Sequence, residues 1–193
     1  GPDLLFLNRS GKPFLDISLL SLPNTPWFSR GAAAADFNGD LLIDLFASES
    51  APITHLDRLA YGEPFRPDVF RMSQSGGPTQ VTRNTLFANT GSSRFAEIGR
   101  MAGLANTGAT WSVKSADYDG DGWTDVFLTT GDARDWTSVA SNNLSGESLQ
   151  GKTRWDILEN SPSRREADKA FRNLGNWQFE ESAKAWGLDH VGM

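Results

Sequence analysis

The sequence predicts an all-β protein made of repeated units of four antiparallel strands, which is the pattern of β-propeller blades. Two observations lead to this prediction. The chain repeats itself at a spacing of 81 residues, and each repeat contains short strands joined by tight turns. The 19 Gly and 9 Pro residues supply the turns that many short strands need. We expect about two and a half blades, a partial propeller with two long connections.

The repeat is seen in two kinds of segment. The acidic segments 36–44 and 117–125 share the pattern Asp-x-(Asp/Asn)-x-Asp-x-x-x-Asp, and their first residues are 81 positions apart. Phe6 and Phe87 have the same separation and each precedes an Asn by two positions. A third Phe-x-Asn segment begins at Phe171, 84 residues after Phe87. The repeats therefore mark successive structural units.

Each unit reads as strand, acidic loop, strand, connection, strand, hairpin turn and strand. The hairpins turn at Thr-Gly-Ser-Ser and Leu-Gly-Asn-Trp, and the flanking runs are rich in apolar and β-branched residues. The predicted strands are 4–8, 14–18, 32–35, 44–47, 85–89, 94–98, 111–116, 125–130, 169–173 and 178–182.

These strands divide the chain into three parts of one propeller segment. Residues 1–26 are expected to form the outer hairpin of a preceding blade. Residues 27–105 form a blade with a connection at 48–83, and residues 108–190 form a blade with a connection at 132–168. Part of the second connection, residues 151–160, has the composition of a short helix. Because open blades expose sheet edges, we expect the remaining blades of a longer chain, or other copies, as partners.

Composition excludes several classes of protein. The chain has no Cys, so it has neither disulfides nor a Cys-based zinc site. Its net charge of −6 comes without a basic cluster, which argues against nucleic acid as a partner. No apolar run is long enough for a membrane span.

The second acidic loop has the donor chemistry of a calcium site. Ca²⁺ takes about six to eight oxygen ligands, and alternate residues of a tight turn can direct their oxygens at one centre. Asp117, Asp119 and Asp121 are the predicted carboxylate ligands. Trp123 would add its backbone carbonyl, and Asp125 would close the site from the outgoing strand. Four carboxylates this close would repel one another unless a cation lay between them.

The first acidic loop is a weakened version of the second. Its corresponding residues are Asp36, Asn38, Asp40, Leu42 and Asp44. Asn38 replaces one carboxylate, and Leu41 occupies the position of Gly122, which predicts a strained backbone. We expect two calcium sites, of which the one at 117–125 is the stronger. The alternative is a pair of Asx-turns that bind no metal. An EF-hand is disfavoured because strands flank the loops and Leu128 stands where an EF-hand has Glu.

The sequence resembles the FG-GAP/VCBS repeat family of integrin-α-type propellers. It is most similar to the bacterial secreted, ASPIC-associated members, through the motifs at Phe171–Phe179 and Asp117–Asp125. The resemblance implies structural calcium held by the loop residues named above, and a full propeller that usually has seven blades. It also implies an extracellular, periplasmic or cell-surface location.

Two functions follow as expectations. The first is a calcium-stabilised binding or scaffold module for adhesion or ligand recognition, with a protein or glycan ligand on the blade loops. Trp136, Trp155 and residues 61–68 are candidate contacts, although most Trp residues of a propeller pack between blades. The second is a segment of a hydrolase or lyase acting on glycans. No catalytic residue is assigned, because no nucleophile, zinc or phosphate-loop motif occurs and the Asp189-His190 pair is expected to face solvent.

Overall fold

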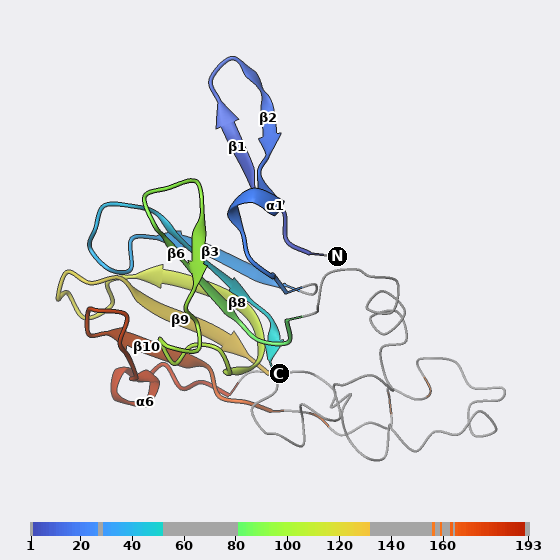
Figure 1. Ribbon diagram of the computed structural model, residues 1–193. Coiled ribbons are helices and arrows are strands. Elements are labelled where there is room, and N and C mark those ends of the chain that lie inside the picture. Colours follow the sequence, from blue (N-terminus) through green and yellow to red (C-terminus); the bar gives the residue numbers. More distant parts are fainter. Residues whose placement is uncertain are drawn as a thin grey trace.

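The computed structural model of the chain describes residues 2–26, 29–51, 81–131 and 165–191, together with the single residues 156, 159 and 163. The described residues form a separate hairpin and two antiparallel sheets (Figure 1). None of the helices in the described part has the length and apolar character that a membrane crossing requires.

The hairpin lies at the N-terminal side of the fold. Strands β1 (Phe6–Arg9) and β2 (Lys12–Asp16) pair with each other and are exposed along their whole length. A single helical turn, α1 (Ser18–Ser21), follows them. Figure 1 shows the hairpin standing away from the two sheets.

The first sheet contains four strands in the order β3-β4-β6-β7. They are β3 (Gly31–Ala35), β4 (Asp44–Ser48), β6 (Thr85–Asn89) and β7 (Phe95–Glu97). Every neighbouring pair is antiparallel. The acidic loop 36–44 joins β3 to β4, so the pairing of these strands fixes both ends of the loop.

The second sheet repeats this arrangement and adds one short strand. Its order is β11-β10-β9-β8-β5. The repeated strands are β8 (Gly108–Ala116), β9 (Asp125–Thr130), β10 (Lys169–Asn173) and β11 (Phe179–Glu181). The acidic loop 117–125 again joins the first strand to the second. A helical turn, α6 (Ala183–Trp186), follows β11.

The additional strand links the two sheets. β5 (Ser50–Ala51) follows β4 in the chain, but it pairs with the beginning of β8. The strands β3 and β8 also approach closely, because a Cβ built on Gly31 would lie 3.1 Å from the Cα of Ser112. Gly31 therefore permits the sheets to meet at this point.

The core lies between the two sheets. Phe46 and Leu86 from the first sheet and Val126 and Leu128 from the second are at most 1% exposed. They belong to one apolar cluster that also includes Phe37, Ala102, Leu104, Val113 and Phe171. Since burying a large aliphatic or aromatic side chain contributes about 1.5–3 kcal/mol, this cluster is a major stabilising contact between the sheets.

The predicted fold class, all-β with antiparallel sheets of four blade-like strands, is confirmed. The strands 85–89, 125–130 and 169–173 have the predicted bounds, while β8 begins three residues before its prediction. The turns α1 and α6 and the strand β5 were not predicted, and β5 lies inside the stretch 48–83 that was assigned to a connection. The rest of that connection, and the Trp136, Trp155 and 61–68 contacts, fall outside the described residues. Within the predicted helix 151–160, only Asp156 and Glu159 are described, and both are helical.

Candidate metal centre

The loop between β8 and β9 is organised around Asp117. Its Oδ1 accepts hydrogen bonds from the backbone N–H groups of Gly120, at 2.7 Å, and Asp121, at 3.1 Å. Its Oδ2 accepts one from the N–H of Gly122 at 2.9 Å. Gly120 and Gly122 have φ angles of 78° and 91°, which residues with a Cβ rarely adopt. The loop thus closes around the carboxylate that begins it.

Asp125 links the loop to the neighbouring strand β10 through hydrogen bonds. It is fully buried at the start of β9, and its two oxygens accept hydrogen bonds from the backbone N–H groups of Tyr118 and Asn173, both at 2.8 Å. Burial raises the pKa of the Asp125 carboxyl, and the nearby charges of Asp119 and Asp121 add to the rise, against the two hydrogen bonds. The ionised form of this buried carboxylate is therefore less favourable than that of an exposed Asp.

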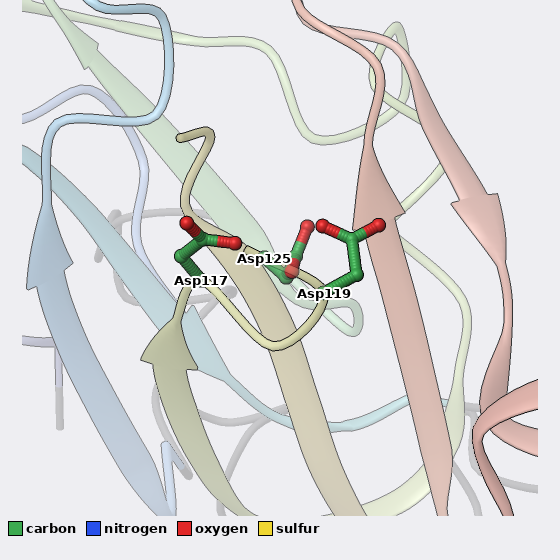
Figure 2. Close-up of side chains that lie close together, drawn as sticks. All are labelled: Asp117, Asp119 and Asp125. Carbon is green, nitrogen blue, oxygen red and sulfur yellow. The ribbon is translucent and has the colours of Figure 1, made fainter. Parts of the chain in front are cut away.

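Three of the predicted ligands come together. Carboxylate oxygens of Asp117, Asp119 and Asp125 lie within 4.8 Å of one another, and Figure 2 shows Asp125 between the other two. A calcium ion holds its oxygen ligands at about 2.3–2.6 Å, so two ligands of one ion lie at most ~5 Å apart. The oxygen-only donor set and its spacing therefore fit a hard divalent cation.

The fourth predicted carboxylate is held by an arginine. Asp121 Oδ2 accepts a hydrogen bond from Nη2 of Arg172 at 2.8 Å, and Asp121 Oδ1 accepts one from the N–H of Trp123 at 2.9 Å. These two hydrogen bonds, that of Trp123 first, lower the pKa of Asp121. Arg172 Nε also lies 2.6 Å from Asp119 Oδ2. Arg172 is not among the residues predicted from the sequence. Ala88 stands at the equivalent position of the preceding repeat.

The first loop has the same scaffold. Asp36 Oδ1 accepts hydrogen bonds from the N–H groups of Gly39, at 2.7 Å, and Asp40, at 3.2 Å, and its Oδ2 accepts one from Leu41 at 2.7 Å. Partial burial raises the pKa of Asp36, but its backbone hydrogen bonds outweigh this and lower the pKa overall. Asp44 is fully buried and accepts hydrogen bonds from the N–H groups of Phe37 and Asn89. Asp125 accepts the corresponding pair in the second loop, from Tyr118 and Asn173. Burial also raises the pKa of Asp44.

The two predicted departures of the first loop have different consequences. Leu41 has a φ of 68°, which confirms the strained backbone expected where the second loop has Gly122. Asn38 replaces a charge with an amide, and its Nδ2 donates to Asp40 Oδ2 at 2.9 Å. In the described ranges, the first loop forms no group of three acidic side chains like that of the second. The ligand roles of all ten predicted residues, in both loops, remain predictions.

Two side chains from outside the first sheet contact the first loop, Asn173 of β10 and Trp123 of the second loop. Asn173 is fully buried, and its Nδ2 donates to the carbonyl oxygens of Phe37, at 2.7 Å, and Thr124, at 2.9 Å. The indole of Trp123 lies against two glycines, since Cβ atoms built on Gly39 and Gly175 would each lie 3.2 Å from it. The two acidic loops are therefore parts of one packed region.

The Asp189-His190 pair, to which no catalytic role is assigned, lies at the surface. Asp189 and His190 are both exposed, as predicted. Their side chains lie on the surface after α6, and the metal centre uses neither.

Comparison with known proteins bears on the second loop. No curated protein matches this chain. Residues 66–128, which include β6, β7, β8 and the whole acidic loop between β8 and β9, match the family model described as FG-GAP-like repeat.

Proposed function

We propose that this chain is a calcium-stabilised β-propeller segment that serves as a binding or scaffold module outside the cytoplasm. The observation that carries the proposal is the group of three carboxylates, Asp117, Asp119 and Asp125, with oxygens within 4.8 Å of one another. The FG-GAP-like repeat match over residues 66–128 supports a propeller-type module built around such loops.

The metal is structural in this proposal. Ca²⁺ would join the loop at 117–125 to the buried carboxylate of Asp125, which begins β9, and so fix the turn between the two strands. A second, weaker calcium would bind at 36–44 through Asp36, Asn38, Asp40 and Asp44. Millimolar extracellular calcium saturates even weak sites of this kind, which favours an extracellular, periplasmic or cell-surface location.

The binding role belongs to the loops that the sheets support. A protein or glycan is the proposed ligand, and the remaining blades of a parent chain or other copies would complete the ring. We assign no catalytic role to this segment and expect no nucleic-acid partner, because the chain is acidic, with a net charge of −6. A segment of a glycan-acting hydrolase or lyase is the alternative, which activity assays on glycans would reveal.

The experiment is a calcium titration by isothermal calorimetry of chelator-treated protein, followed by thermal unfolding with calcium and with excess EGTA. We expect saturable binding and a higher melting temperature with calcium. Asp119→Ala removes a ligand and should weaken binding at the second loop at least about tenfold. Glu180→Ala removes the same charge from an exposed position of β11 and should leave binding unchanged. A melting temperature independent of calcium would rule out the proposal.

A further inference from the structure

We propose that Arg172 is a built-in counter-cation of the second loop, which lowers the affinity of this loop for calcium and releases Asp121 when the ion binds. This inference rests on the calcium site proposed above, and it concerns a residue of β10 that lies outside the loop. It reduces the advantage in affinity that the sequence predicts for the loop at 117–125 from its larger number of carboxylates.

The contacts of Arg172 place its charge on two candidate ligands. Nε lies 2.6 Å from Asp119 Oδ2, and Nη2 donates to Asp121 Oδ2 at 2.8 Å. Since Asp121 Oδ1 accepts the N–H of Trp123, both oxygens of Asp121 are already engaged. This agrees with the geometry of the loop, in which Asp117, Asp119 and Asp125 converge without Asp121.

The guanidinium changes the charge balance between the loops. The second loop has four carboxylates, at Asp117, Asp119, Asp121 and Asp125, and the charge of Arg172 brings their sum from −4 to −3. The first loop has three carboxylates, because Asn38 is neutral, and its sum is also −3. Ala88 occupies the position of Arg172 in the first sheet, as Phe87 pairs with Leu45 where Phe171 pairs with Val126. The loop with the extra carboxylate is thus the loop with the extra cation.

Release of the arginine is physically easy. The Arg172 side chain is 40% exposed, so its guanidinium can turn into solvent when calcium takes its place beside Asp121. Partly exposed ion pairs are weak, and solvent screens them, so calcium can replace the guanidinium at Asp121. A guanidinium that stays within several ångströms of a divalent ion would instead repel it. Either way, the positive charge of Arg172 opposes binding.

The test compares calcium affinities by isothermal calorimetry of the chelator-treated chain. All proteins carry Asp40→Asn, which weakens calcium binding at the first site, so that the calorimeter measures binding at the second site. We expect Arg172→Gln to bind calcium about tenfold more tightly than the parent, because the charge is lost while a hydrogen-bonding side chain remains. Arg172→Lys keeps the positive charge but loses the paired contact with Asp119 and Asp121, and it should bind calcium less tightly than Arg172→Gln. The matched control is Lys169→Gln, since Lys169 lies on the same strand but pairs with Glu181, away from the loop.

A second readout needs only folded, calcium-loaded protein. The rise of melting temperature with calcium concentration should be steeper at low calcium for Arg172→Gln than for Lys169→Gln, even if the first variant unfolds in chelator. Unchanged or weaker calcium binding by Arg172→Gln would overturn the role of Arg172 while leaving the calcium site intact. Absence of calcium binding in every protein, including the chain without substitutions, would overturn both proposals.

Discussion

The two acidic loops share a backbone scaffold but differ in how each is held. In both, the first Asp accepts the N–H groups of the turn and the last Asp is buried beneath it. The first loop is contacted by Asn173 of β10 and by the indole of Trp123 from the second loop, whereas the second loop is contacted by the guanidinium of Arg172 from β10. Among the described residues, a Cβ on Gly120 in the second loop would meet no neighbouring atom within 4 Å. Equal patterns of acidic residues can therefore sit in unequal surroundings.

The largest expected difference is between two asparagines at the same repeat position. Asn173→Ala removes the buried donation to Phe37 and the partly buried one to Thr124, and should lower the free energy of unfolding by about 3 kcal/mol. Asn89→Ala removes a single exposed donation to Ile43 from its Nδ2, and should cost about 1 kcal/mol or less. Urea unfolding in the presence of chelator measures the loss of stability in both variants. Equal losses would show that Asn173 does not join the sheets.

A smaller difference is expected between two glycines with nearly equal φ angles. Gly39 and Gly120 have φ of 76° and 78°, so replacement by Ala strains both by about 1 kcal/mol. Only at Gly39 does the new methyl meet an indole, that of Trp123 at 3.2 Å. Gly39→Ala should therefore be the more destabilising by about 1 kcal/mol. Thermal unfolding of the pair checks this, and the same comparison in Trp123→Leu should abolish the difference.

The smallest effect is expected from Leu41, which is 91% exposed and has a φ of 68°. Leu41→Gly relieves the left-handed strain, in part offset by the added freedom of the unfolded chain, so a net stabilisation of about 0.5–1 kcal/mol is expected. The reverse change, Gly122→Ala at a φ of 91°, should destabilise by a similar amount. Unfolding in chelator measures the backbone effect alone, and a loss of stability in Leu41→Gly would contradict it.

The sequence predicts the local features of the fold well, because these depend on patterns within a few residues. The strands of the outer hairpins and the position of each acidic loop follow from apolar and β-branched runs and from the repeat, although the ends of β1 and β2 differ by one or two residues from the predicted 4–8 and 14–18. The positive φ of Leu41 follows from its alignment with Gly122. The spacing of Asp residues predicts four converging carboxylates; Asp117, Asp119 and Asp125 do converge, whereas Asp121 pairs with Arg172.

The features that the sequence does not predict depend on long-range contacts. β5 is only two residues long, and it forms because Ser50 and Ala51 reach the free edge of β8, far along the chain. The pairing of Asp121 with Arg172 spans 51 residues. Alignment of the repeats shows that Arg172 stands where the preceding unit has Ala88. Only the geometry of β10 shows that its guanidinium reaches the loop.

The hydrogen bond from Asn173 to Phe37 also has a consequence for how the protein is made. Its two residues are 136 positions apart in the chain. At a synthesis rate of about 5–20 residues per second, roughly 7–27 s separate the appearance of the acceptor from that of its donor. In the later part of that interval, after β7 (Phe95–Glu97) has been made, the first sheet is complete but β10, which carries the donor to the Phe37 carbonyl, is absent. Nascent chains are thus most prone to misassembly after the first sheet has been made and before β10 is synthesised. Slowly translated codons between β7 and β10 would lengthen this period.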